Sequence, residues 1–255
     1  MTTNAIPYER SQLEIIDAVP KRALVVFAHP DDGELGAGGV IATWSAQGCE
    51  IAMVVCTSGS SGSNDTAMTS ESIVAIRRSE QLKASEVAGA QHVEFLDHPD
   101  GELEADRAFL GEIVWMIRKY RPEVVLCHDP HRFNGFNHRD HRMVGTGVLD
   151  AIYPYARDHL HFPEQMEHEG IEPHKVREVL MWGSDSPNAI VDTSRGVEKQ
   201  IEALHQHKSQ VEGLSGGPAV GDRLRERARV VATNYPFEYG QAYRRLIARA
   251  YVHNS

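Results

Sequence analysis

The chain of 255 residues has few cysteines, no long apolar run and no start that resembles a signal peptide. Its three cysteines, Cys49, Cys56 and Cys127, cannot all pair with one another, and no Cys-x-x-Cys spacing occurs. This cysteine usage favours a reducing compartment, so we expect a cytoplasmic protein. The first residues lack a basic start and an apolar core, and no run approaches the roughly 20 apolar residues of a membrane span, so we expect a soluble chain.

Basic residues are also scarce relative to acidic ones. The chain has 26 Lys and Arg against 36 Asp and Glu, a formal net charge of -10, and it has no basic cluster. Such a charge balance repels polyanions, which argues against a nucleic acid or an anionic membrane surface as the main partner. We expect a small polar molecule as the partner instead.

Apolar residues make up 41% of the chain, which is enough for one large domain over residues 1–255. Short apolar runs alternate with helical patterns. We expect strands at 23–28, 51–56, 92–97, 124–128, 179–182 and 189–192, and helices at 40–47, 71–87, 109–119, 195–210, 222–233 and 239–251. This alternation predicts an α/β fold with a Rossmann-like, mostly parallel sheet and helices on both faces.

The first motif, Ala28-His29-Pro30-Asp31-Asp32, stands at the end of the apolar run 23–28. That run is short, continuous and β-branched, as in a strand buried on both faces of a parallel sheet. In open α/β sheets ligands bind beyond the carboxyl ends of the strands. We therefore expect the chemistry on the loop that carries His29 and Asp32.

The residue types of this loop suit a metal site. Imidazole nitrogen and carboxylate oxygen are ligands of catalytic zinc, which typically takes three protein groups and leaves a fourth position open for water. His29 and Asp32, completed by His141, would make such a set. Asp31, beside a ligand, is the natural acceptor for a proton of that water.

The second motif, His138-Arg139-Asp140-His141, supplies groups of the same kinds. On a helical turn His138 shares a face with His141, so one can bind metal while the other contacts the substrate. Asp140 could orient or electrostatically tune His138, which makes both of them candidate catalytic residues. Taken singly, each motif is more typical of a turn or a polar loop. Because both motifs lie at strand ends of one domain and supply complementary ligands, we favour the metal site.

At these residues the sequence resembles the PIG-L/LmbE-like zinc-dependent de-N-acetylases. The first motif, followed by Gly38-Gly39, is similar to the signature of that family, and His138-x-Asp140-His141 is similar to its second motif, with Arg139 where proline is common. The resemblance covers about residues 22–245 and continues through Arg77-x-x-Glu80, Phe95-Leu96-Asp97-x-Pro99-Asp100-Gly101, His207-x-Ser209-Gln210 and Tyr239-Gly240-Gln241-Ala242-Tyr243-Arg244.

The resemblance implies roles for single residues. It implies metal ligation by His29, Asp32 and His141, a general base in Asp31, support of the tetrahedral intermediate or acid catalysis by His138, and substrate contacts by Arg77 and Asp100. Members of the family remove acetyl groups from amino sugars or cleave related amides. The motifs therefore indicate the reaction better than the substrate.

Other candidate features of the sequence are less supported. Gly36-Ala37-Gly38-Gly39 lacks the third glycine of a dinucleotide-binding loop, and Gly59-Ser60-Ser61-Gly62 lacks the last glycine of a nucleophile elbow. For His128 and His131 we expect places around the ligands or on the surface rather than ligation. We expect His207 at a helix end packed on the sheet.

We therefore expect a zinc-dependent hydrolase that removes the N-acetyl group of an amino sugar or glycoside and releases acetate. Two histidines and one aspartate also accept Fe2+ or Co2+. Two alternatives stay open: an amidase for a thiol conjugate or a non-sugar N-acyl compound, and a non-catalytic sugar- or metal-binding protein on the same scaffold. A homo-oligomer also stays open, as does the role of the segment 157–175, rich in His and Glu, in substrate specificity or a subunit contact.

Overall fold

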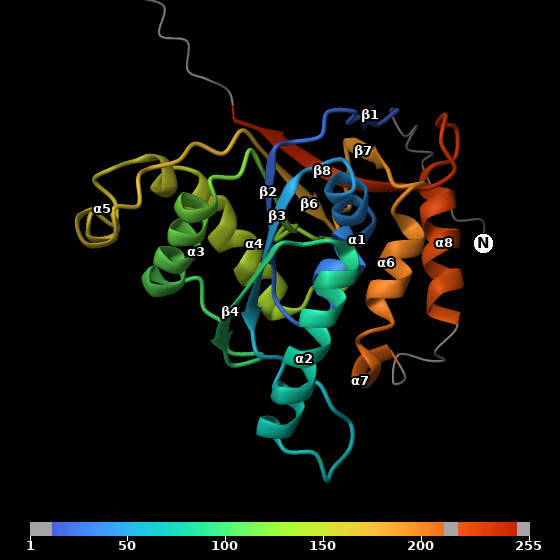
Figure 1. Ribbon diagram of the computed structural model, residues 1–255, viewed down its shortest axis with the longest axis horizontal. Coiled ribbons are helices and arrows are strands. Elements are labelled where there is room, and N and C mark those ends of the chain that lie inside the picture. Colours follow the sequence, from blue (N-terminus) through green and yellow to red (C-terminus); the bar gives the residue numbers. More distant parts are fainter. Residues whose placement is uncertain (1–11, 212–218, 249–255) are drawn as a thin grey trace, which may run out of the picture.

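The computed structural model describes residues 12–211 and 219–248 (Figure 1). Its strands are β1 (Glu14–Ile15), β2 (Arg22–Phe27), β3 (Glu50–Thr57), β4 (His92–His98), β5 (Val124–His128), β6 (Glu178–Trp182), β7 (Ala189–Asp192) and β8 (Gly240–Ile247). Its helices are α1 (Asp32–Ser45), α2 (Ser70–Ala88), α3 (Arg107–Tyr120), α4 (Arg139–Ile152), the 3-10 turn η1 (Tyr155–Arg157), α5 (Glu164–Glu169), α6 (Val197–Leu204), α7 (Lys208–Val211) and α8 (Ala219–Val231). In these ranges no helix is both long and apolar enough to cross a membrane.

The strands form one eight-stranded sheet in the order β1-β7-β8-β6-β5-β2-β3-β4. Neighbouring strands run parallel, except that β8 runs antiparallel to both β6 and β7. The expected mostly parallel α/β sheet is confirmed.

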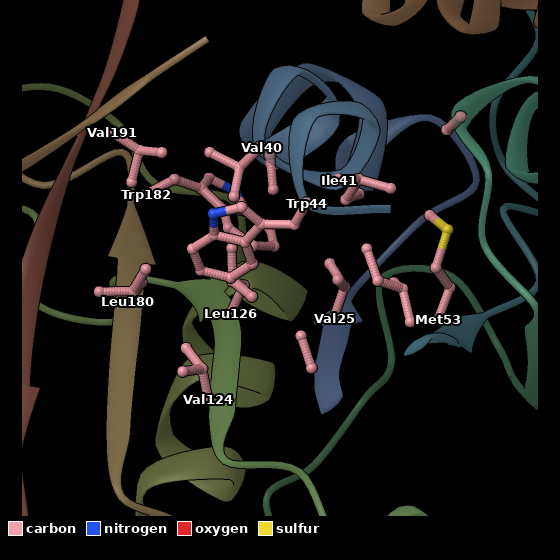
Figure 2. Packing of buried hydrophobic residues seen from close by; sticks show 14 of the residues in the cluster. Val25, Val40, Ile41, Trp44, Met53, Val124, Leu126, Leu180, Trp182 and Val191 are labelled. Carbon is pink, nitrogen blue, oxygen red and sulfur yellow. The ribbon is translucent and has the colours of Figure 1, made fainter. Parts of the chain in front are cut away.

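The central strands are apolar on both sides because helices cover both faces of the sheet. In β2, Val25 and Phe27 pack on one face and Leu24 and Val26 on the other. The first face lies against α1, where Trp44 and its neighbours fill the space above β2, β5 and β6 (Figure 2). The second face lies against α3 and α4. Burial on both faces is the physical reason that the strand carries no polar alternation.

The carboxyl ends of β2 and β5 meet at a topological switch point. From β2 the chain moves outward through β3 to β4, and then crosses to β5 on the opposite side of β2. Loops that leave neighbouring strands toward opposite sides open a crevice between them, where ligands bind in open α/β sheets. Both sequence motifs follow these two strands.

The helix expected at 239–251 is wrong, because residues 240–247 form β8. β8 lies between β6 and β7, and its backbone pairs with both strands. Pairing on both sides satisfies the backbone polar groups of three strands at once, which outweighs the local preference of this stretch. Residues 249–251 lie outside the described residues.

Two other helix boundaries differ from the sequence-based expectation. The helix expected from Val40 begins at Asp32, so Gly38 lies inside α1 rather than at its start. A Cβ at Gly38 would lie 2.7 Å from Cγ of Gln200 on α6, so the glycine permits close packing of two helices. The helix expected at 195–210 is divided into α6 and α7.

The His- and Glu-rich segment packs on α3 through a buried arginine. The guanidinium of Arg118 donates to the backbone oxygens of Ala156, His161 and Phe162, at 3.2, 2.8 and 3.2 Å. Between α3 and this segment lies a cavity of about 470 Å³, with Trp115 in its lining. The segment is thus part of the domain, held by Arg118 and by Phe162, which is buried in the core.

Candidate metal centre

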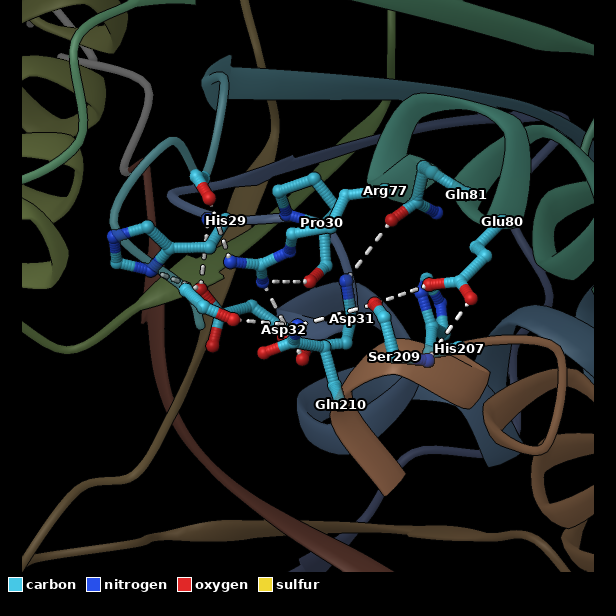
Figure 3. A network of polar contacts seen from close by, with 12 residues as sticks. His29, Pro30, Asp31, Asp32, Arg77, Glu80, Gln81, His207, Ser209 and Gln210 are labelled. Atoms are coloured by element: carbon cyan, nitrogen blue, oxygen red, sulfur yellow. Dashed lines mark hydrogen bonds and ion pairs between the residues drawn. The ribbon is translucent and has the colours of Figure 1, made fainter. Parts of the chain in front are cut away.

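The first motif forms the turn between β2 and α1. Asp31 precedes α1 and has a φ of 104°, a left-handed conformation that is strained for a residue with a Cβ. Two side chains of α2 hold this turn (Figure 3): the Asp31 amide donates to Oε1 of Gln81 at 3.0 Å, and Nη2 of Arg77 donates to the Pro30 carbonyl oxygen at 2.6 Å. As a result, the adjacent carboxylates of Asp31 and Asp32 face different partners.

The three expected metal ligands meet at one point. Oδ2 of Asp32 lies 3.1 Å from Nδ1 of His29 and 3.1 Å from Nε2 of His141, and the two nitrogens are 3.3 Å apart. A tetrahedral zinc with ligands at about 2.0 to 2.2 Å separates neighbouring ligand atoms by about 3.3 to 3.6 Å. Two imidazole nitrogens and one carboxylate oxygen in this triangle therefore fit a single divalent metal ion.

Asp140 lies nearer to His29 than to His138, the partner expected from the sequence. Oδ2 of Asp140 is 3.1 Å from Nε2 of His29 and 4.0 Å from Nδ1 of His138. It also accepts a hydrogen bond from the amide of Gly101 at 2.7 Å. Asp140 therefore orients His29 so that Nδ1 faces Asp32. A carboxylate on the far nitrogen is the usual partner of a metal-binding histidine.

Asp100, expected to contact the substrate, also lies against His29. Its Oδ1 is 3.0 Å from Nε2 of His29. Burial alone would lower the pKa of His29, but the carboxylates of Asp100, Asp140 and Asp32 outweigh it and raise the pKa to about 11. Without metal, His29 therefore holds a second proton, which a metal on Nδ1 must displace.

Asp31 has surroundings that suit proton exchange. Its burial and the charge of Asp32 raise the pKa of Asp31 to about 7, against the opposing effect of Arg77. Nη2 of Arg77 lies 3.5 Å from Oδ2 of Asp31. Arg77 was expected to contact the substrate, but its guanidinium is buried and bound to the backbone oxygens of Pro30 and Gly59. It supports the turn that carries Asp31.

His138 stands beside the triangle with an accessible ring. Its side chain is 47% exposed, and its ring meets the ring of His29 edge to face at 4.6 Å. As the residue before α4, His138 accepts a hydrogen bond at Nδ1 from the amide of Asp140 at 3.2 Å. Partial burial and the charges of His29 and His141 lower the pKa of His138. Since Nδ1 accepts from the amide, the neutral ring carries its proton on Nε2.

His128 lies next to the triangle, as expected for a residue around the ligands. Its ring stacks on that of His141 at 4.0 Å, and its Nε2 is 3.6 Å from Oδ2 of Asp32. Asp32, His128 and His141 are close enough to form an alternative ligand group, as are His29, His138 and His141. In the first group His128 would replace His29.

A buried polar network behind Asp31 escaped the sequence analysis. Nε2 of Gln81 donates to Oε1 of Glu34 at 2.8 Å, and Oε2 of Glu34 lies 3.3 Å from Nε2 of His207. Burial opposes protonation of His207, but Glu34 raises its pKa above the usual value. His207 lies between α6 and α7. In the sequence, only its place in a motif of the family resemblance indicated that it is close to the site. No sequence feature indicated Glu34, since an acidic residue in the first turn of a helix is common.

The chain is similar in sequence to proteins of known family. The profile of the PIG-L family, described as GlcNAc-PI de-N-acetylase, matches residues 24–152, a span that contains both motifs. Diacetylchitobiose deacetylase of Thermococcus kodakarensis is 31% identical over 191 residues, 74% of this chain and 70% of that protein. 4-Oxalmesaconate hydratase of Pseudomonas putida is 35% identical over 142 residues, 52% of this chain and 54% of that protein.

A solved structure shares the arrangement over most of the chain. N,N'-diacetylchitobiose deacetylase from Pyrococcus horikoshii, complexed with its inhibitor MPG, superposes with a TM-score of 0.81 and 25% sequence identity. The superposition covers 89% of this chain and 84% of that one.

Proposed function

Since this chain belongs to the PIG-L family of GlcNAc-PI de-N-acetylases, we propose that it hydrolyses the N-acetyl amide of an amino sugar at a zinc ion held by His29, Asp32 and His141. The observation that carries the proposal is the triangle of Nδ1, Oδ2 and Nε2 atoms, with sides of 3.1, 3.1 and 3.3 Å. A buried carboxylate, Asp31, precedes one of these ligands.

A divalent metal at the triangle would supply a Lewis acid for the acetyl carbonyl and would lower the pKa of a water to about 7. Zinc is our choice because two histidines and one aspartate are ligands that it takes in catalytic sites. Fe2+ and Co2+ accept the same donor set, so availability decides among them. The substrate is a small N-acetylated molecule, in keeping with the net charge of -10.

Asp31 serves as the general base in this proposal. With a pKa of about 7, its carboxyl group can take a proton from the attacking water and return it to the leaving nitrogen at neutral pH. The water oxygen forms a bond to the acetyl carbon, and the carbon–nitrogen bond then breaks. Acetate and a free amine leave, and the proton count of Asp31 is restored.

His138 serves as a hydrogen-bond donor. Its Nδ1 is occupied by the amide of Asp140, so its Nε2–H is the group available to a substrate. A neutral N–H donor beside the metal position stabilises the negative charge that develops on the acetyl oxygen. Of the two roles expected from the sequence, this favours support of the tetrahedral intermediate over acid catalysis.

The proposal is tested by measuring acetate release from N-acetylated amino sugars, glycosides and thiol conjugates, with protein that has been stripped and refilled with zinc. Chelator-sensitive release from an amino sugar is the expected result, and Asp31→Asn should abolish it while zinc stays bound. If acetate is released only from a thiol conjugate or a non-sugar amide, that class replaces the amino sugar as the proposed substrate.

The similarity to a hydratase adds one arm to this test. The same zinc-filled protein is incubated with 4-oxalmesaconate, and loss of the double bond is followed by absorbance. We expect no turnover. Hydration without acetate release from any amide would overturn the proposal. No turnover in either assay, with zinc bound, would favour a binding protein.

A further inference from the structure

Trp182 and His128 form a buried pair at the ends of neighbouring strands. The two residues are paired in register between β6 and β5, and Nε1 of Trp182 donates a hydrogen bond to Nδ1 of His128 at 3.1 Å. The indole lies in the apolar layer that faces α1 (Figure 2). Gly36 of α1 makes room for it, because a Cβ at Gly36 would lie 2.4 Å from the indole. The indole is thus fixed by the hydrogen bond to His128 and by the close approach of α1 at Gly36.

The indole determines which nitrogen of His128 carries the proton. An indole N–H can only donate, so Nδ1 of His128 is the acceptor in this 3.1 Å contact, and the Asp32 carboxylate 3.6 Å from Nε2 favours the proton of the neutral ring on that nitrogen. The Ala28 amide lies 3.3 Å from Nε2. That contact is a hydrogen bond only in the other tautomer, in which Nδ1–H would face the indole N–H.

The protonated nitrogen of His128 faces a proposed metal ligand. Nε2 lies 3.6 Å from Oδ2 of Asp32, and the ring of His128 stacks on that of His141 at 4.0 Å with an interplanar angle of 19°. One small ring therefore borders two of the three proposed ligands. His128 is itself buried, so its ring contacts these ligands away from the surface.

We propose that Trp182 and His128 are positioning residues of the metal centre: the indole holds His128 in the Nε2–H tautomer, and this N–H orients the carboxylate of Asp32. The same tautomer excludes His128 as a ligand, because neither nitrogen then has a free lone pair. Trp182 thereby favours His29 over His128 as the partner of Asp32 and His141. The inference rests on the proposed metal site and is independent of the proposed hydrolysis of the acetyl amide.

The test removes the indole N–H while keeping the aromatic ring. Zinc affinity is measured by competition with a chromophoric chelator, and the Co2+-substituted protein is compared by visible absorption. We expect Trp182→Phe to weaken zinc binding about tenfold or more, as for other losses of outer hydrogen bonds, and to change the Co2+ spectrum. In that variant His128 is free to place its proton on Nδ1 and to accept from the Ala28 amide.

Two substitutions at His128 separate orientation from ligation. His128→Gln keeps an N–H donor near the position of Nε2, so we expect zinc affinity within about threefold of the unmodified protein. His128→Ala removes the donor and should match the loss in Trp182→Phe. Equal, large losses in His128→Gln and His128→Ala would identify His128 as a ligand and overturn the inference.

Trp44→Phe is the matched control, since Trp44 is another buried indole in the same apolar layer (Figure 2). It should leave zinc affinity and the Co2+ spectrum unchanged. Unchanged zinc affinity in Trp182→Phe, or an equal loss in Trp44→Phe, would overturn the inference. Wild-type protein that binds no zinc would overturn the metal site as well, whereas zinc binding without acetate release would overturn the proposed reaction alone.

Discussion

Oδ2 of Asp140 lies 3.1 Å from Nε2 of His29, so a carboxylate of the second motif orients a histidine of the first. His29 lies on the loop after β2, Asp140 lies in the first turn of α4, and the contact is buried. It holds Nδ1 of His29 toward Asp32. The second motif thus acts on the metal position twice, through His141 as a proposed ligand and through Asp140 as the partner of another.

Asp140→Asn should weaken zinc binding by about tenfold or more. The amide keeps the shape of the side chain but loses the charge that holds the Nε2 proton of His29, so His29 becomes a weaker ligand. Chelator competition measures the effect. Asp97→Asn, an exposed carboxylate paired with Arg78, is the control and should leave affinity unchanged. Equal affinities for both variants would contradict the role of Asp140.

Asp31→Asn should reduce acetate release at least about a hundredfold while zinc stays bound, because an amide cannot accept the proton of the attacking water. Metal content is measured on the same sample by elemental analysis. Full activity in the zinc-filled variant would remove Asp31 from the reaction.

The stability of the metal-free protein should depend on Asp31 and on pH. Burial and the neighbouring Asp32 raise the pKa of Asp31 to about 7, so the folded state favours its protonated form. That contribution is fully present below the usual pKa of about 4 and is lost as pH rises through 7. Asp31→Asn should therefore gain up to about 4 kcal/mol at pH 8 relative to wild type, at about 1.4 kcal/mol per pKa unit, and little at pH 4.

Urea unfolding of chelator-treated wild type and variant at pH 4, 6 and 8 measures this difference. A gain that stays constant across the three pH values would show that the effect comes from shape and not from ionisation of Asp31.

His138→Asn should lower kcat by about a hundredfold and leave zinc affinity within a few fold. Asparagine can still accept from the amide of Asp140 and cap α4, but it lacks the Nε2–H that is proposed to face the acetyl oxygen. Steady-state kinetics and unfolding are measured together. If the free energy of unfolding falls by as much as the activation free energy rises, and nothing else changes, His138 would be assigned to the helix and not to the reaction.

Arg118→Lys should destabilise the protein by at least about 3 kcal/mol, since a single ammonium group cannot reach the several carbonyl oxygens that the guanidinium bridges. The segment 155–165 should become sensitive to limited proteolysis. Arg78→Lys, at an exposed ion pair, is the control and should change stability by less than about 1 kcal/mol. Unchanged proteolysis in Arg118→Lys would contradict the role of Arg118.

Much of the fold could be predicted because buried parallel strands are continuous apolar runs. β2 and β5 have no polar alternation, so their positions and the crevice at their ends were visible in the chain itself. β8 was not, since it pairs with two strands that are distant in sequence, and that pairing outweighs its local pattern. The start of α1 was misplaced because a glycine such as Gly38 usually indicates a turn. Here the glycine lies inside the helix, where the close packing of α6 requires it.

By itself the sequence determined that His29, Asp32 and His141, the proposed ligands, and the carboxylate of Asp31 follow β2 and β5, since position along the chain decides which strand a residue follows. Only the tertiary structure decided that Asp140 faces His29, that Arg77 is buried against the turn that carries Asp31, and that Trp182 contacts His128. These contacts join elements far apart in the chain. The direction of each side chain depends on the packing around it, which no local pattern records.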